Sequence, residues 1–212
     1  MSTNRVNNDF SDITFNRRSV RVYDEQVKIS QEEMLAMIQE ATTAPSSVNM
    51  QPWRFVVVES DDQKAKLKPL IRFNTRQNDT SSAMILIFGD LACYELGEEI
   101  YNHAVEVGKM PAEVRDQQLA TIIPYYKSFS KEQMSSIVKV DASLAAMQLM
   151  LVARAHGYET NPIGGFEADQ LAEAFDMDPE RYVPVLIVSI GQAKESGYES
   201  IRLDAEKITT FK

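Results

Sequence analysis

The sequence has few of the residues that build disulfides and metal centres. Its 212 residues include one cysteine, Cys93, and two histidines, His103 and His156, which are far apart in the chain. One cysteine excludes an intramolecular disulfide and any four-cysteine zinc or iron–sulfur site, and neither histidine belongs to a metal-binding motif. The sequence therefore predicts no metal site, and so few cysteines are typical of a reducing compartment.

Motifs of several common enzyme classes are also missing. The chain has no Gly-x-Gly-x-x-Gly pattern, no P-loop and no Gly-x-Ser-x-Gly nucleophile motif. These absences argue against a nucleotide site on a Rossmann fold and against covalent catalysis.

Positive charge and long apolar runs are scarce as well. The chain has 22 Lys and Arg against 31 Asp and Glu, a net charge of -9. An acidic chain has no global electrostatic reason to bind nucleic acid or anionic membrane. No apolar run approaches the roughly 20 residues of a membrane span, and the polar segment Met1–Phe10 lacks the apolar core of a signal peptide. We expect a soluble, cytoplasmic protein.

The composition is that of a globular protein, with 44% apolar and 25% charged residues, and no linker divides the chain. We therefore expect one domain, 1–212. Ser30 and Glu33 form a capping-box pattern that predicts a helix to about Thr43. Apolar periodicity predicts further helices at 61–70, 94–107, 111–122, 131–156 and 168–175, and strands at 55–58, 83–88, 158–160 and 183–190.

A polar tail of about 20 residues, roughly 192–212, follows the last predicted strand. It carries spaced apolar residues, namely Ile201, Leu203, Ile208 and Phe211. Such a tail needs a surface to pack on, and a second subunit could provide it.

Three segments are unusual for an acidic globular chain. Arg17–Arg21 holds three arginines and a serine, and is either a solvated basic turn or an anion site, since guanidinium forks match phosphate. Ala44–Trp53 combines Pro, Ser, Asn and Gln before a strand, as a plain turn would, but its amides could also read the edge of a planar heterocycle. Asn161–Phe166 contains Gly164-Gly165, which make a turn or let the backbone approach a ligand closely.

Taken together and in this order, the three segments resemble the nitroreductase family of FMN-dependent oxidoreductases. The matching motifs are Arg-Arg-Ser-x-Arg at 17–21, Pro-Ser-Ser-x-Asn-x-Gln-Pro-Trp at 45–53 and Pro-Ile-Gly-Gly-Phe at 162–166. Asn74 with Gln77 resembles the family's Asn-Gln segment, and the resemblance spans about residues 15–205. Residues 94–130 match no family motif.

The resemblance implies an α+β fold with a central mixed β-sheet wrapped by helices. It also implies a homodimer with an FMN site at each of two interface positions and a C-terminal tail exchanged between the subunits. The residues that it places at FMN are Arg17, Arg18, Ser19, Arg21, Pro45, Ser46, Ser47, Asn49, Gln51, Asn74, Gln77, Pro162, Ile163, Gly164, Gly165 and Arg202.

The resemblance also assigns roles within that set. Arg17, Ser19 and Arg21 would hold the phosphate and ring edge, with Arg202 at the phosphate. Ser46, Ser47 and Asn49 would reach the flavin of the partner subunit. Asn74 would contact the pyrimidine edge of the flavin. The turn Pro162–Gly165 would lie against the ring system, with the Gly164 N–H near N5. Two departures are Ser200, where some members have Lys, and Gly164, where a large branch has Glu.

The implied reaction is hydride transfer from NADH or NADPH through flavin N5 to a nitroaromatic or quinone-type acceptor by a ping-pong mechanism. No side chain is required as an acid or base; Arg21 would stabilise the reduced flavin electrostatically. Tyr125, Tyr126 and Phe129 either line the acceptor pocket or pack between helices. Two alternatives stay open: a protein that stores or senses FMN, and a superfamily member that oxidises its substrate without a nicotinamide.

Overall fold

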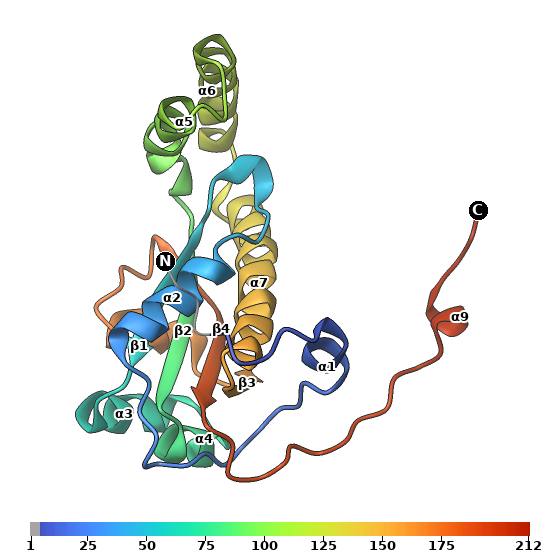
Figure 1. The fold of residues 1–212 in the computed structure, drawn as a ribbon. Coiled ribbons are helices and arrows are strands. Elements are labelled where there is room, and N and C mark those ends of the chain that lie inside the picture. The colour runs from blue at the N-terminus through green and yellow to red at the C-terminus, as the bar shows by residue number, and fades with distance from the viewer. Residues whose placement is uncertain (1–4) are drawn as a thin grey trace.

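The computed structural model describes residues 5–212 and is built on a four-stranded sheet in the order β1-β2-β4-β3 (Figure 1). The strands are β1 (Trp53–Val58), β2 (Ala83–Asp90), β3 (Glu159–Ile163) and β4 (Tyr182–Gly191). All three strand pairs are antiparallel. Among residues 5–212, the parallel pairing expected of a mixed sheet is limited to one isolated bridge, between Ser19 and Thr160.

Strand β2 lies in the centre of the molecule, and all eight of its residues are buried. Its side chains alternate between two apolar clusters, because successive residues of a strand point to opposite faces. Ala83, Ile85 and Ile87 belong to the cluster on one face, and Met84, Leu86 and Phe88 to the cluster on the other. Helices therefore cover both faces of the sheet, which explains why the strand is apolar from Ala83 to Phe88.

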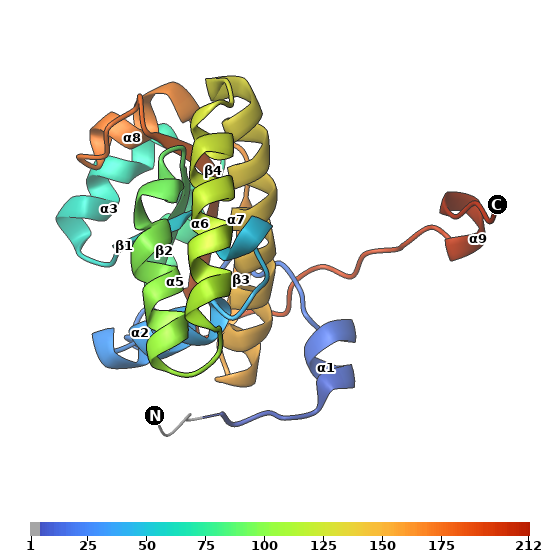
Figure 2. The ribbon, with the colours of Figure 1, turned by 90° about the horizontal axis from the view of Figure 1, so that it is seen from above.

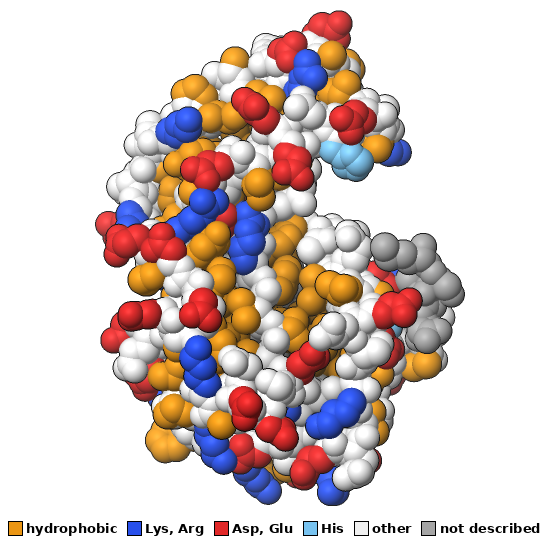
Figure 3. Space-filling model, turned by 90° about the vertical axis from the view of Figure 1, so that its left-hand side faces the viewer, with side chains coloured by type: hydrophobic (Ala, Val, Ile, Leu, Met, Phe, Trp, Pro, Cys, Tyr) orange, Lys and Arg blue, Asp and Glu red, His pale blue; other side chains and the backbone are white. Residues whose placement is uncertain are grey.

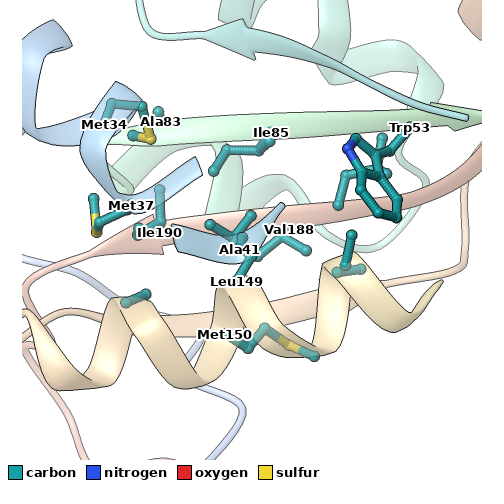
Figure 4. Packing of buried hydrophobic residues seen from close by; sticks show 14 of the residues in the cluster. Met34, Met37, Ala41, Trp53, Ala83, Ile85, Leu149, Met150, Val188 and Ile190 are labelled. Carbon is teal, nitrogen blue, oxygen red and sulfur yellow. The ribbon is translucent and has the colours of Figure 1, made fainter. Parts of the chain in front are cut away.

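The first face is covered by α2 (Gln31–Ala41) and the long α7 (Lys131–Ala155). Figure 4 shows the packing between them, with Met34 and Met37 of α2, Ile85 of β2 and Leu149 of α7. The contact between α7 and β2 is close: a Cβ added at Gly89 would lie 2.5 Å from the Val138 side chain. A side chain at position 89 would therefore push α7 away from the sheet.

Capping differs between these two helices. At α7, Ser130 and Gln133 form the complete reciprocal capping box. At α2, the Ser30 side chain accepts the Glu33 N–H, but the Glu33 carboxylate accepts a hydrogen bond from Tyr158 Oη at 2.9 Å. The predicted capping residue therefore ties α2 to the segment before β3.

The second face of the sheet is covered by shorter elements. They include α3 (Asp61–Leu67), a 3₁₀ turn at Lys68–Leu70 and α8 (Ala168–Ala174), whose apolar residues share one cluster with β2. Helix α4 (Thr75–Thr80) follows and leads into β2. The predicted helix at 61–70 is thus an α-helix followed by a 3₁₀ turn.

Two helices extend from one end of this body: α5 (Gly97–Glu106), preceded by a 3₁₀ turn at Cys93–Leu96, and α6 (Ala112–Lys127). They pack on each other, as their side-by-side position in Figure 2 shows, and Figure 1 shows that they stand off from the sheet. In the space-filling view, the part that carries them overhangs a deep indentation, and apolar side chains gather between it and the body (Figure 3). Helix α6 continues through Pro124, beyond its predicted end at 122.

The first and last described segments lie outside the sheet. Helix α1 (Phe10–Phe15) packs against α7. The tail after β4 leads away from the body in both ribbon views and ends near a short helix, α9 (Ala205–Ile208) (Figures 1 and 2). Its apolar side chains are exposed: Ile201 and Phe211 by 92%, Ile208 by 71% and Leu203 by 65%. Residues 5–212 of one chain therefore leave these side chains unburied.

By length and composition, α7 would be long and apolar enough to cross a membrane, contrary to our expectation from the sequence. It packs instead on β1, β2, β3 and β4, and half of its most apolar window is buried. The central helix of a globular protein meets the same criteria, so its apolar character is explained by its place in the core.

Candidate functional site

The segment Arg17–Arg21 lies along the outer side of β3. Ser19 and Thr160 form a parallel bridge, and the Val20 N–H donates to the Thr160 carbonyl at 3.1 Å. Strand β3 continues directly to Gly164 and Gly165. The first and third of the unusual segments, about 140 residues apart in the sequence, are therefore neighbours.

Asn74 and Gln77 belong to the same place. The Asn74 Nδ2 donates to the carbonyls of Ile71 (3.0 Å) and Gly165 (3.4 Å), and the Gln77 Nε2 donates to Asn74 Oδ1 at 3.2 Å. We call this assembly the arginine half of the site; its residues are Arg17–Arg21, Asn74, Gln77 and 162–165.

The predicted turn at Pro162–Gly165 is only partly correct. Pro162 and Ile163 belong to β3, paired with Val188 and Ile187 of β4, so the strand runs three residues beyond its predicted end at 160. Neither glycine has a left-handed backbone. A Cβ added at Gly164 would meet nothing within 4 Å, and one added at Gly165 would lie 3.6 Å from Asn74 Nδ2. Open space therefore lies beside the backbone of Gly164.

The tail contributes to the arginine half before it leaves the body. Tyr23 and Ala193 form a bridge, and the tail then passes so close to the basic segment that a Cβ added at Gly197 would lie 2.6 Å from Arg18 Cβ. Next along the tail, the Tyr198 ring lies 5.0 Å from the Arg21 guanidinium carbon. This course brings the following tail residues, Arg202 included, toward the basic segment.

The electrostatics of the arginine half favour an anion. Burial lowers the pKa of Arg17, and the positive charges of Arg202, Arg18 and Arg154 lower it further, against an opposing effect of Glu159. Among residues 5–212, the buried Nη1 of Arg17 has no hydrogen-bond partner. Because arginine stays charged at physiological pH, a bound anion would satisfy it.

The other arginines differ from Arg17 in the hydrogen bonds that their guanidinium groups already make. Arg18 Nη1 donates to the carbonyls of Phe15 (2.8 Å) and Arg17 (3.0 Å), so it serves the local backbone. Arg202 Nη1 donates to Ser200 Oγ at 2.9 Å, the position where some family members have Lys. In the described part of the chain, Arg17 is thus the arginine that has a buried nitrogen without a hydrogen-bond partner.

The segment Pro45–Gln51, which we call the loop half, is held by its own chain. Val48, Asn49 and Gln51 have left-handed φ angles of 45°, 56° and 46°, which are uncommon for residues other than glycine. Asp141 of α7 accepts hydrogen bonds from the Ser47 N–H and the Ser47 hydroxyl. The Ser46 hydroxyl accepts from the Gln51 N–H at 3.0 Å.

The two halves do not meet within one chain. The loop half is attached to α7 at Asp141, whereas the arginine half lies near Arg154, which contributes to the pKa of Arg17. Thirteen helical residues correspond to about 20 Å along α7. The structure therefore brings together the first and third predicted segments, and leaves Ser46, Ser47 and Asn49 on another part of the surface.

A cavity of about 730 Å³ lies beside the loop half, between it and the helices α5 and α6. No charged side chain is among its lining residues, which are Val48, Asn49, Ile100, Tyr101, Ala104, Met110, Val114, Gln117, Gln118, Thr121 and Ile122. Tyr125, Tyr126 and Phe129 do not line it. Tyr125 packs edge-on against Phe129 with ring centroids 4.5 Å apart, and Tyr126 is buried in the cluster with Cys93.

Sequence reasoning missed two residues that organise the loop half, Asp141 and Tyr101. A signal for Asp141 exists, because it is the one charged residue on the face of α7 that holds Val138, Ala142 and Ala145. The Tyr101 hydroxyl donates to the Val48 carbonyl at 2.9 Å, and no sequence spacing indicates this contact. Within residues 5–212, no group of three or more His, Cys, Asp or Glu side chains could hold a metal ion.

The comparison with known families covers both halves. The model described as "Nitroreductase family" matches residues 15–192. The chain belongs to the nitroreductase family. This confirms the resemblance drawn from the three motifs, the α+β nitroreductase-like fold and the expectation of an oxidoreductase, while the tail exchange between subunits stays a prediction.

Other nitroreductase-family proteins are similar over nearly their whole length. A Bacillus subtilis protein named "Putative NAD(P)H nitroreductase YdgI" is 51% identical over 97% of this chain and 98% of its own. A structure from Exiguobacterium sibiricum, described as a nitroreductase in complex with FMN, has a TM-score of 0.95 and 53% identity, and the match covers 97% of this chain and 98% of that one. The "CLA biosynthesis enone reductase" of Lactiplantibacillus plantarum is 41% identical over 98% of this chain and 96% of its own.

Proposed function

We propose that this nitroreductase-family chain is an FMN-dependent oxidoreductase that takes hydride from NADH or NADPH and reduces a small organic acceptor. Bound FMN supplies the redox chemistry, accepting hydride at N5 and passing it on, so the protein provides binding, orientation and electrostatics. The names of its relatives support both cofactors: one similar structure contains FMN, and YdgI is named for NAD(P)H.

The observation that carries this proposal is the arginine half. The buried Arg17 Nη1 without a partner, the charge of Arg202 acting on Arg17 and the open space beside Gly164 are what a phosphate and a planar ring require. Arg17 and Arg202 would hold the phosphate, and Arg18 would order the segment through its backbone bonds. Asn74 and Gln77 would place amides at the ring edge, with Ser19 and Arg21 alongside.

The loop half then belongs to the flavin of a second subunit. Ser46, Ser47 and Asn49 are about 20 Å along α7 from the arginine half of their own chain, so they complete a site only in a homodimer. The exposed apolar residues of the tail give the second subunit a surface to cover, as do Val140, Leu144 and Met147 on α7. We expect one domain per chain, 1–212, with 192–212 wrapping the partner.

The acceptor would bind beside the loop half, in the cavity lined by α5 and α6. Its apolar and amide lining without charge suits an uncharged aromatic or quinone, such as a nitroaromatic. Donor and acceptor would use the same exposed ring face in turn, which gives ping-pong kinetics.

An α,β-unsaturated ketone is a second acceptor class. The 41% identical enone reductase favours it, and an uncharged lining of this size would accommodate an enone with an apolar chain. In either case we expect the enzyme to act in the cytoplasm.

Spectroscopy tests the proposal directly. We expect the purified protein to be yellow, with about one FMN per chain, and its absorbance to bleach on anaerobic addition of NADH or NADPH. Reoxidation by a quinone, a nitroaromatic or an enone then ranks the acceptors. A protein that takes up no FMN would contradict the proposal, and a flavoprotein that neither nucleotide bleaches would instead be a storage or sensing protein or an oxidase of another substrate.

A further inference from the structure

The loop half has a backbone conformation that its own sequence does not favour. Val48, Asn49 and Gln51 all have φ between 45° and 56°, and a β-branched residue such as valine is a rare outlier there. No glycine relieves the segment Pro45–Gln51. Such a conformation persists only where surrounding contacts determine it.

Those contacts come from three helices. Asp141 of α7 accepts from the Ser47 N–H (3.0 Å) through Oδ2 and from the Ser47 hydroxyl (3.1 Å) through Oδ1. Tyr101 of α5 donates to the Val48 carbonyl at 2.9 Å, and Tyr126 of α6 donates to the Ser47 carbonyl at 3.4 Å. Both polar groups of the Ser47 backbone are therefore bound by side chains more than 70 residues away in the sequence.

Asp141 is the strongest of these partners. It is 3% exposed, and both of its oxygens bind Ser47. Burial raises the pKa of this carboxyl, and the two hydrogen bonds from Ser47 lower it. The loop therefore offsets part of the free-energy cost of burying the carboxylate. Hydrogen bonds to a charged acceptor are about twice as strong as neutral ones.

We propose that Asp141 is a positioning residue of the flavin site: by binding Ser47 it fixes the left-handed loop that presents the exposed Asn49 to the cofactor of the partner subunit. This inference rests on the proposed function and extends it, because Asp141 touches neither cofactor nor substrate and acts through Ser47. The Ser46 hydroxyl, which accepts the Gln51 N–H, is held in the same arrangement.

Three variants of the full chain test the inference. Asp141→Leu removes both acceptors, whereas Asp141→Asn keeps one oxygen for the Ser47 N–H. Gln148→Leu is the matched control: Gln148 is on the same helix, and its Nε2 donates to the Glu40 carbonyl at 3.1 Å and to the Thr43 hydroxyl, ahead of the loop. It lies outside the binding machinery described above.

Two measurements are made on each variant. Amide hydrogen exchange of peptide 45–52 in the apoprotein reports the loop without any cofactor. Titration of the apoprotein with FMN, followed by kcat and KM of the FMN-saturated enzyme, reports the site. For Asp141→Leu we expect at least tenfold faster exchange and roughly ten- to a hundredfold weaker FMN binding. Asp141→Asn should lie between Asp141→Leu and wild type, and Gln148→Leu should match wild type in both.

The outcomes separate this inference from the proposed function. If the wild type binds FMN and Asp141→Leu binds it equally well with unchanged exchange at 45–52, Asp141 has no positioning role and the oxidoreductase proposal stands. If Gln148→Leu loses FMN as strongly as Asp141→Leu, the effect belongs to helix packing and the inference is also wrong. A wild-type apoprotein that takes up no FMN overturns both.

Discussion

The two halves of the candidate site are built in opposite ways. The arginine half has a donor left over, since the buried Nη1 of Arg17 has no partner among residues 5–212. In the loop half, the Ser47 backbone is bound on both sides, by Asp141 and Tyr126. The left-handed φ angles of the segment lie at the following residues, Val48, Asn49 and Gln51. A buried unsatisfied guanidinium nitrogen costs free energy that a ligand can recover, whereas a fully bound loop is already organised.

This difference indicates a division of labour. We propose that the arginine half supplies charge for an anion, and that the loop half supplies a backbone shape already held by contacts from α5, α6 and α7. Because the halves are about 20 Å apart along α7, neither can work with the other in one chain. Variants that disrupt the arginine half, the loop half or the tail that we expect to join the subunits should therefore change different measured properties.

The largest effect should come from removing the C-terminal tail, which we expect to hold the two subunits together. Deletion of residues 198–212 removes the exposed side chain of Tyr198 and four exposed aliphatic or phenyl side chains, Ile201, Leu203, Ile208 and Phe211. Each of these side chains contributes roughly 1.5–3 kcal/mol when fully buried. We therefore expect the deletion to raise the dissociation constant of the dimer more than about a thousandfold. Light scattering should report twice the 24.0 kDa chain mass for the wild type and a single chain for the deletion. A truncated chain that stays dimeric at the same concentration would show that the tail does not hold the subunits together.

The next effect concerns the charge of the arginine half. Arg17→Ala and Arg202→Ala should each weaken FMN binding roughly ten- to a hundredfold, because a hydrogen bond to a charged group contributes about 1.5–3 kcal/mol. Hydride transfer in the FMN-saturated enzyme should change little, since the phosphate is remote from the reacting atom. Titration of the apoprotein and stopped-flow reduction separate the two quantities, and unchanged affinity in both variants would place the phosphate elsewhere.

A smaller effect should follow from displacing the tail without touching a charge. At Gly197 a Cβ would lie 2.6 Å from Arg18 Cβ and 2.8 Å from the Ser19 carbonyl oxygen, which is too close for either to remain in place. Gly197→Ala should therefore shift Tyr198 and Arg202 and weaken FMN binding severalfold, by less than Arg202→Ala. The control is Ser196→Ala at the neighbouring tail position, where the side chain is exposed and no new Cβ is introduced, and it should bind FMN as the wild type does. If Gly197→Ala binds FMN as the wild type does, the tail does not fix Arg202.

The sequence allowed most of the arginine half to be predicted, and its motifs identified the family. What it concealed is geometry that depends on partners far away in the chain. Pro162 and Ile163 were expected in a turn because glycines follow them, yet pairing with β4 keeps both in a strand. Likewise, Glu33 has the spacing of a capping residue, but Tyr158 competes for its carboxylate.

The conformation of the loop half depends even more on residues that are far away in the sequence. Its residues were identified by type, but nothing local predicts left-handed backbone at Val48, because valine disfavours it. Only the contacts from α5, α6 and α7 explain it. Four strands were predicted, but hydrophobic periodicity does not indicate which strands pair, so the antiparallel order β1-β2-β4-β3 was not predictable from it.

The smallest predicted effect concerns how much the buried Asp141 carboxyl lowers the free energy of unfolding. Burial raises the pKa of Asp141 above its ordinary value, so the folded state favours the protonated form more than the unfolded state does. The stability from this group is therefore fully present below the unfolded-state pKa of about 3.9 and is lost as pH rises through the folded-state pKa. At pH 7 the charged carboxyl is a net cost that Asp141→Asn removes, while the amide oxygen still accepts the Ser47 N–H.

We thus expect Asp141→Asn to unfold at the same temperature as the wild type or slightly above it at pH 7, with the advantage shrinking toward pH 4. Each 1 kcal/mol corresponds to about 2–4 °C in Tm for a chain of this size. The measurement is calorimetry of the apoproteins across that pH range. A variant that is less stable at pH 7 would mean that the two Ser47 bonds outweigh the cost of burying the charge, and Asp141 would then stabilise the fold as well as position the loop.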